Sequence, residues 1–339
     1  MKLRVSLLKL RLRHPFRISR EVSEQKYNVI LRLTDEDGVY GLGEAAPSVY
    51  YNQSAESVRE HLSGLDETDF SDPYLRSRII ERVGVKLGGQ RSALAAVDMA
   101  LHDWIGKRLR VPLYRLFGLD PSQTPLSSFT IGLAKGDELE RKLIEAKNFP
   151  ILKLKLGTEM DQEIVTSVRA VTSVPLWVDA NAAWEFEEAQ QKIFWLADRG
   201  VALVEQPLSA GNLEGLKRLT KLSPIPIIAD ESVCNSKDVL RLNGCVHGIN
   251  IKLSKCGGLS EALRMIHIAQ CQDMKIMLGC FIESSLSITA AAHLCSLVDF
   301  PDLDGNLLIK NDPYVGVEAE GGRLVLPDRP GVGVEDRRC

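Results

Sequence analysis

The sequence lacks the features that mark membrane proteins and nucleic-acid-binding proteins. Charged residues interrupt every apolar run before it approaches the ~20 residues that a membrane-spanning helix needs. The formal net charge is −3 over 339 residues, so no basic surface is expected to attract nucleic acid. These two absences argue against a membrane partner and against a nucleic-acid partner.

Cysteine is irregularly placed, with seven residues, an odd number, and no C-x-x-C pair. This pattern argues against a disulfide framework or a zinc site and predicts free thiols in a reducing compartment. Residues 1–13 alternate charged and apolar side chains and contain no apolar core of a signal peptide. We therefore expect a half-exposed strand there and a cytoplasmic location.

Length and pattern together indicate one large domain and a smaller one. Residues 1–120 are predicted to form an α+β domain with a long helix at 91–107 and strands at 1–13, 26–34 and 39–44. Residues 121–305 alternate short apolar runs with amphipathic helical patterns, which is typical of a parallel β/α barrel. Residues 306–339 are rich in glycine and proline, and we expect a loop-like tail that returns to the first domain.

Five ionisable residues recur through the predicted barrel at intervals of 22 to 26 residues: Lys155, Asp179, Glu205, Asp230 and Lys252. Each lies at or just past the end of an apolar run. In a β/α barrel the carboxyl ends of the strands form the rim that carries the active site. A single acid after a strand is more often a helix cap, but five at this regular spacing predict an enzyme.

Asp179, Glu205 and Asp230 are predicted metal ligands, because they lie on three adjacent strands. Three oxygen ligands without histidine or cysteine favour Mg²⁺ over Ca²⁺, and both over Zn²⁺. Lys155 and Lys252 fall on the second and sixth of eight strands, so they should face each other across the mouth. This arrangement fits removal of an α-proton from a metal-bound carboxylate substrate, which gives an enediolate, and reprotonation from the opposite face.

For that chemistry the lysines must be neutral, and we expect nearby positive charge and burial to lower their pKa values. On the eighth strand Asp302 and Asp304 lie two residues apart and should point the same way. A substrate ammonium is the predicted partner of these two acids, and an aspartate-rich turn before Gly305 is the alternative.

The chain resembles the enolase superfamily, in particular the muconate-lactonizing-enzyme-like subgroup, nearly from end to end. The motifs that carry the resemblance are Gly41-Leu42-Gly43-Glu44-Ala45, Lys153-Leu154-Lys155, Val178-Asp179-Ala180-Asn181, Glu205-Gln206-Pro207, Ala229-Asp230-Glu231-Ser232 and Asn250-Ile251-Lys252. Within the subgroup it looks like a dipeptide epimerase, similar to the Ala-Glu epimerases. The motifs for this closer likeness are Asp302-Leu303-Asp304-Gly305 and the run from Gly279 to Ser285.

The resemblance implies a (β/α)7β modified TIM barrel under an N-terminal α+β capping domain. It implies one Mg²⁺ per subunit on the three acids, with Lys155 and Lys252 as the acid/base pair. Lys153 would neutralise the substrate carboxylate, Asp302 and Asp304 would bind the α-ammonium of a dipeptide, and Thr130 and Cys280 would line the pocket.

The sequence departs from the Ala-Glu branch in the capping loop predicted at residues 17–26. Counted from Pro15, Glu21 stands where that branch has an arginine for the substrate side chain, with Arg20 beside it. A Glu21 that faces the pocket would suit a cationic or neutral C-terminal residue, so we count Glu21 among the substrate-binding residues.

The predicted function is a Mg²⁺-dependent epimerase that inverts the α-carbon of the C-terminal residue of a dipeptide. The alternatives within the subgroup are a muconate-type cycloisomerase, an o-succinylbenzoate synthase and an N-acylamino acid racemase. A Schiff-base aldolase or a non-catalytic binding barrel would belong to other classes. The sequence leaves open which dipeptide is used and whether the chain forms a homo-oligomer.

Overall fold

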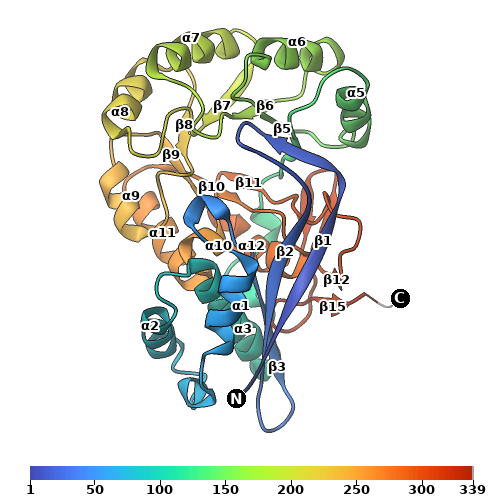
Figure 1. Ribbon diagram of the computed structural model, residues 1–339, viewed down its shortest axis with the longest axis vertical. Helices are drawn as coiled ribbons and strands as arrows, with labels where there is room; N and C mark the ends of the chain where they lie inside the picture. Colours follow the sequence, from blue (N-terminus) through green and yellow to red (C-terminus); the bar gives the residue numbers. More distant parts are fainter. Residues whose placement is uncertain (338–339) are drawn as a thin grey trace.

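The computed structural model describes residues 1–337, and Cys339 lies outside this part. The N-terminal part forms an antiparallel sheet in the order β1-β2-β3, which packs against α3 (Figure 1). Its elements are β1 (Lys2–Ile18), β2 (Glu21–Thr34), β3 (Tyr40–Ala45), α1 (Ala55–Ser63), α2 (Arg76–Lys86), α3 (Arg91–Leu109) and α4 (Leu113–Leu116). Short 3-10 helices occur at η1 (Val49–Tyr51), η2 (Glu67–Phe70), η3 (Pro121–Gln123) and η4 (Cys295–Leu297).

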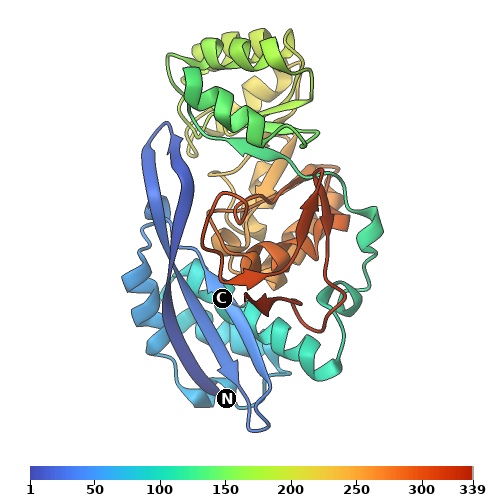
Figure 2. The same ribbon diagram turned by 90° about the vertical axis from the view of Figure 1, so that its right-hand side faces the viewer.

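The β1–β2 hairpin is longer than the sequence suggested. The loop predicted at residues 17–26 is wrong, because Ile18 pairs with Glu21 across a two-residue turn, and the strands continue on both sides. Figure 2 shows the hairpin leaving the N-terminal domain and reaching the barrel. At the tip, the backbone N–H of Leu133 donates a 2.9 Å hydrogen bond to the carbonyl of Arg17. The hairpin thus covers the rim of the barrel.

The second part is an eight-stranded parallel sheet whose strands follow one another in chain order. The backbone N–H of Ser128, just before the first strand, donates a 3.2 Å hydrogen bond to the carbonyl of Pro301 on the last, which closes the barrel. The strands are β4 (Phe129–Ile131), β5 (Leu152–Lys155), β6 (Leu176–Asp179), β7 (Val201–Glu205), β8 (Ile227–Ala229), β9 (Gly248–Ile251), β10 (Lys275–Gly279) and β11 (Phe300–Asp302). The predicted fold class, a modified TIM barrel with an N-terminal capping domain, is confirmed.

Helices cover the outside of the barrel, and Figure 1 shows the arc from α5 to α9 around the strands. These helices are α5 (Gly136–Glu145), α6 (Asp161–Val171), α7 (Phe186–Ala197), α8 (Leu213–Leu222), α9 (Ser236–Leu242), α10 (Leu253–Cys256), α11 (Leu259–Cys271) and α12 (Ser285–Ala292). Leu176 and Val178 of β6 join the large apolar cluster that includes residues of these helices. Trp177 lies between them in sequence and joins a separate cluster with Leu203, Ile228 and Met277. Because side chains alternate along a strand, this second cluster is the apolar layer inside the barrel.

The tail is more ordered than the predicted loop. It contains two small antiparallel sheets, formed by β12 (Tyr314–Val315) with β15 (Glu335–Asp336) and by β13 (Glu318–Glu320) with β14 (Arg323–Val325). The backbone N–H of Val332 donates to Asp103 Oδ1 at 2.8 Å, so the tail contacts α3 of the N-terminal part. The domain boundaries expected near residues 120 and 305 stay predictions.

Across residues 1–337, no helix is both long and apolar enough to cross a bilayer. The six cysteines within this range are free thiols.

Candidate active site

A layer of charged side chains lies directly above the apolar layer inside the barrel. Asp179 follows Trp177 by two residues, and Glu205 follows Leu203 by two, so each acid lies on the inner face of its strand. Asp230 stands two residues after Ile228 in the same way. The alternation of the strands therefore brings three acids into the barrel mouth, where they are between 0% and 3% exposed.

The three carboxylates converge as predicted. Asp179, Glu205 and Asp230 each offer an oxygen atom, and these oxygens all lie within 4.8 Å of one another. Asn250 Nδ2 donates to Glu205 Oε1 at 2.7 Å, and the backbone N–H of Asn181 donates to Asp179 Oδ1 at 2.8 Å, which fixes the orientation of two acids. An all-oxygen, anionic donor set of this kind fits a hard divalent cation such as Mg²⁺.

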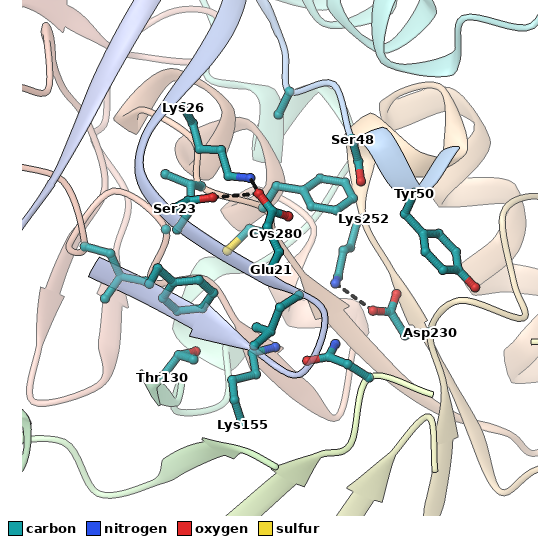
Figure 3. Close-up of a pocket in the computed structure, with 18 of the residues that line it drawn as sticks. Glu21, Ser23, Lys26, Ser48, Tyr50, Thr130, Lys155, Asp230, Lys252 and Cys280 are labelled. Atoms are coloured by element: carbon teal, nitrogen blue, oxygen red, sulfur yellow. Dashed lines mark hydrogen bonds and ion pairs between the residues drawn. The ribbon is translucent and has the colours of Figure 1, made fainter. Parts of the chain in front are cut away.

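Two lysine amines reach this group of acids from opposite strands. Lys155 Nζ donates to Asp179 Oδ2 at 2.5 Å. Lys252 Nζ donates to Asp230 Oδ2 at 2.7 Å (Figure 3). Lys155 ends β5, and Lys252 directly follows β9, four strands away in the ring of eight. The structure therefore places an amine on each side of the cavity in front of the acids.

Burial and neighbouring charges shift the pKa values of these acids in different directions. Burial alone would raise the pKa of Asp230, but Lys252 and Lys255 hold it well below its usual value. Burial and the nearby Asp179 raise the pKa of Glu205 to about 7. A negative carboxylate at Glu205 is therefore costly without a further positive charge, which again fits a cation site.

We expected burial and nearby positive charge to lower the pKa of the two lysines, and for Lys252 this prediction is wrong. Burial lowers the pKa of Lys252, but attraction by Asp230 and Glu205 outweighs burial and leaves the pKa above its ordinary value. The acids that approach the amine therefore outweigh both burial and the positive charge of Lys153. Lys255 is bound to Asp230 as well, at 2.5 Å, but its side chain is fully buried, whereas Lys252 lines the cavity.

Lys153 links the three convergent acids to Asp302 on the last strand. Its Nζ lies 2.5 Å from Glu205 Oε2 and donates to Asp302 Oδ2 at 2.6 Å. The other oxygen of Asp302 accepts a 2.6 Å hydrogen bond from Ser128 Oγ. Both oxygens of Asp302 are therefore already engaged by groups of the barrel.

Asp304 lies just past the end of β11 and is only 3% exposed. Its Oδ2 accepts a 2.5 Å hydrogen bond from the backbone N–H of Thr130. Burial and the charge of Asp302 raise the pKa of Asp304 to about 6. A positive group beside Asp304 would relieve this cost, which fits a site for an ammonium. Cys280 lies close by, with its thiol donating to the carbonyl of Asp302 at 3.3 Å.

A cavity of about 460 Å³ lies between the capping hairpin and the barrel mouth. The sequence-predicted residues that line it are Glu21, Thr130, Lys153, Lys155, Asp230, Lys252, Cys280, Asp302 and Asp304. Asp179 and Glu205 do not line it, but each has a carboxylate oxygen within 4.8 Å of one from Asp230, which does. All eleven predicted site residues therefore lie in one region, and their individual roles stay predictions.

Sequence reasoning missed the contacts that the capping domain makes at this cavity. Arg20 Nη2 donates to Glu231 Oε1 at 2.7 Å, and its Nη1 donates to the carbonyl of Asn181 at 2.9 Å. The guanidinium also lies 4.4 Å from the ring centre of Tyr50 on η1. These partners are far apart in the chain, so no local pattern could have indicated them.

Glu21 does face the cavity, but it is not free. Its Oε1 accepts a 2.6 Å hydrogen bond from Ser23 Oγ and forms an ion pair with Lys26 (Figure 3). Lys26 was not among the predicted site residues. It stands opposite Leu10 in the strand pairing, and no motif in the sequence marked it as a residue of the cavity.

Comparison with known proteins places both halves of the chain in one family. The model of the mandelate racemase/muconate lactonizing enzyme N-terminal domain matches residues 2–118, and the enolase C-terminal domain-like model matches residues 137–338. The chain belongs to the enolase superfamily. This confirms the family resemblance drawn from the motifs.

Members of the enolase superfamily with related sequences cover nearly the whole chain. The chain is 40% identical over 336 residues to the L-Ala-D/L-Glu epimerase of Bacteroides thetaiotaomicron, a match that covers 98% of this chain and 88% of that protein. It is 38% identical over 339 residues to the L-Ala-D/L-amino acid epimerase of a Maribacter species, covering 98% and 99%. A solved dipeptide epimerase from Cytophaga hutchinsonii, complexed with Mg and the dipeptide D-Ala-L-Val, superposes with a TM-score of 0.93 at 27% identity and covers 99% of this chain and 95% of that one.

Proposed function

We propose that this protein is a Mg²⁺-dependent dipeptide epimerase that inverts the α-carbon of the C-terminal residue. The observation that carries the proposal is the pair of amines, Lys155 and Lys252, on opposite sides of a buried group of three acids. Two bases on opposite faces of one carbon can invert it, because one removes the proton and the other returns a proton to the opposite face. The relatives described above bear epimerase names, which supports the same reaction class.

Asp179, Glu205 and Asp230 would hold the cation, because they are buried, anionic and convergent. When bound, Mg²⁺ supplies positive charge that stabilises the negative charge arising on the substrate carboxylate as the α-proton leaves. Lys153 adds a further fixed positive charge beside Glu205. Asn250 and Asn181 keep the acids in place through the hydrogen bonds described above.

Lys155 and Lys252 exchange roles with the direction of the reaction. The neutral amine of one lysine takes the α-proton from its side, and the ammonium of the other returns a proton from the opposite side. The first lysine gains a proton and the second loses one, so after a turnover the two lysines have exchanged protonation states. Because Lys252 is paired with Asp230, its release from that carboxylate is part of reaching the neutral form.

Asp304, with Asp302 beside it, is the proposed site for the α-ammonium of the dipeptide. Asp304 is buried, is oriented by Thr130, and lacks the lysine that Asp302 has in Lys153. Thr130 and Cys280 form the adjacent wall of the cavity. An N-acylated or cycloisomerase substrate has no ammonium and would leave this acid uncompensated, so we favour a dipeptide over the other substrates of the subgroup.

The test is α-proton exchange in D₂O with a set of L-Ala-containing dipeptides, read by mass spectrometry with Mg²⁺ and with EDTA. We expect deuterium at the α-carbon of the second residue together with formation of the other epimer, both dependent on Mg²⁺. Incorporation in N-acyl amino acids but in no dipeptide would favour the racemase alternative. The cytoplasmic location and the homo-oligomer remain predictions from the sequence.

A further inference from the structure

We infer that Glu21 and Lys26 neutralise each other on the capping side of the cavity, so that the enzyme prefers dipeptides whose second residue has an uncharged side chain. This inference rests on the proposed function and adds the substrate class to it. It also narrows the expectation from the sequence, in which a Glu21 that faces the pocket would suit a cationic or neutral C-terminal residue, to the neutral class.

The capping hairpin is the surface that the side chain of the second residue must meet. The α-carbon that changes configuration has four substituents, and the barrel accounts for three of them. Its hydrogen faces Lys155 or Lys252, and its carboxylate faces the three acids that would hold the cation. Its nitrogen leads to the N-terminal residue and therefore toward Asp304. The remaining substituent is the side chain, which points out of the barrel toward the hairpin.

The wall in that direction is largely apolar. Phe16 and Ile18 of the hairpin and Ile282 and Leu308 of the barrel side line the same cavity. Glu21, Ser23 and Lys26 lie together on the hairpin, and Thr130, Lys155 and Lys252 lie on the barrel side (Figure 3). The charge of this wall is therefore decided by Glu21, Lys26 and the neighbouring Arg20.

All three charges are matched within the protein. Arg20 is paired with the buried Glu231, so it is not available to a substrate carboxylate. Glu21 is the one carboxylate within ion-pairing distance of Lys26 among the described residues. Burial would raise the pKa of Glu21, but hydrogen bonds from Lys26 and Ser23 lower it below its usual value, so the carboxylate is ionised and the pair is neutral as a unit.

A charged substrate side chain would have to break this pair. A cation bound to Glu21 would leave Lys26 without its partner, and an anion bound to Lys26 would leave Glu21 without its partner. Either result places an unbalanced charge against an apolar wall, whereas an uncharged side chain leaves the pair intact. The side chain of Glu21 is 46% exposed and that of Lys26 is 32% exposed, so solvent reduces the cost of breaking the pair. We therefore expect a preference of about tenfold for uncharged over charged second residues, not absolute exclusion of the charged ones.

Two opposite substitutions test the inference. The wild-type protein, Glu21→Gln and Lys26→Met are compared by kcat/KM for L-Ala-L-Val, L-Ala-L-Glu and L-Ala-L-Lys, with Mg²⁺ present. The wild type should favour L-Ala-L-Val by about tenfold over both charged dipeptides. Glu21→Gln frees Lys26, so the ratio of L-Ala-L-Glu to L-Ala-L-Val should rise about tenfold. Lys26→Met frees Glu21, so the ratio for L-Ala-L-Lys should rise by a similar factor.

The matched control is Glu24→Gln, which removes an exposed acid of the same strand that does not line the cavity. It should leave all three ratios at their wild-type values. A wild-type preference for a charged dipeptide would overturn the inference, and so would shifts in the same direction for both variants. Exchange with none of the dipeptides would instead overturn the proposed function, so the two failures are distinguishable. Folding of each variant is checked by its thermal unfolding midpoint.

Discussion

The barrel mouth and the capping hairpin meet at one cavity, but their charges are held in different ways. In the mouth, Lys155 and Lys252 are 8% and 7% exposed, and each is held by a buried acid. On the hairpin, Glu21 and Lys26 are partly open to solvent and hold each other. A buried charge that loses its partner costs several kcal/mol, whereas an exposed pair is worth roughly 0–1 kcal/mol. The two lysines proposed for proton transfer are thus held in place by buried partners. The pair of Glu21 and Lys26, proposed to set the substrate preference, can be substituted at little cost in the free energy of unfolding.

The largest expected effect is on the chemistry of the mouth. Lys252→Ala should reduce epimerisation about 10²–10⁴-fold, because one of the two proton-transfer groups is lost. Exchange of the α-proton from the face served by Lys155 should persist for one epimer, as seen by deuterium incorporation in D₂O. Lys217→Ala on the outside of α8 should leave both activities unchanged. Equal loss of both reactions would show that Lys252 supports the fold of the site and does not itself transfer the proton.

Removal of the metal should abolish turnover, because the positive charge that stabilises the negative charge on the substrate carboxylate is lost. With EDTA we expect no detectable epimerisation, and added Mg²⁺ should restore it. A second measurement does not depend on activity: Mg²⁺ at about 100 times its Kd should stabilise the native protein by about 2.7 kcal/mol and raise its thermal unfolding midpoint. Glu205→Gln should weaken this shift, whereas Glu188→Gln on α7 should keep it. A shift of the same size in both variants would place the ion elsewhere.

Asp304→Asn should have an intermediate effect that depends on the substrate. Hydrogen bonds to a charged group are worth about 1.5–3 kcal/mol, so kcat/KM for dipeptides should fall roughly 10- to 100-fold. Turnover of an N-acetylated dipeptide, which has no ammonium, should change little. Equal losses for both substrates would argue that Asp304 positions Thr130 and does not bind the ammonium.

The smallest effect is expected at the hairpin tip. Arg20→Gln removes the ion pair with Glu231 and the hydrogen bond to Asn181, so the tip should be held less firmly over the mouth. The Arg20 side chain is 36% exposed and does not touch the three acids, so KM should rise only about three- to tenfold, with a smaller change in kcat. Loss of its partner by Glu231, which is 1% exposed, should appear instead as a lower thermal unfolding midpoint. Arg264→Gln, which breaks an exposed ion pair on α11, is the control. A larger effect on kcat than on KM would mean that the hairpin contributes to the chemistry.

The rim could be predicted from the sequence because two regular features coincide there. The spacing of Asp179, Glu205 and Asp230 follows the β/α repeat, and the alternation along each strand points them inward. The contacts that hold the hairpin over the barrel mouth have no such regular pattern in the sequence. Arg20 and Glu231 are 211 positions apart, and neither lies in a repeating pattern that includes the other.

The hairpin was predicted too short for a related physical reason. The segment from Arg17 to Lys26 shows little of the apolar alternation that identifies a half-buried strand, because much of it is exposed at the tip. The strands of the tail were missed because they are only two or three residues long and lie among glycines and prolines. In both regions strand pairing with distant residues, and not local preference, determines the structure.

The apolar layer of Trp177, Leu203, Ile228 and Met277 has a practical consequence for handling the protein. This layer fills the barrel beneath the acids, so within residues 1–337 we expect the substrate to enter, and its epimer to leave, through the cavity between the hairpin and the barrel mouth. The loops at the other end of the barrel, such as residues 198–200, lie away from the cavity through which substrate and product pass. Attachment to a solid support through those loops should therefore preserve turnover, whereas attachment near the hairpin tip should obstruct it.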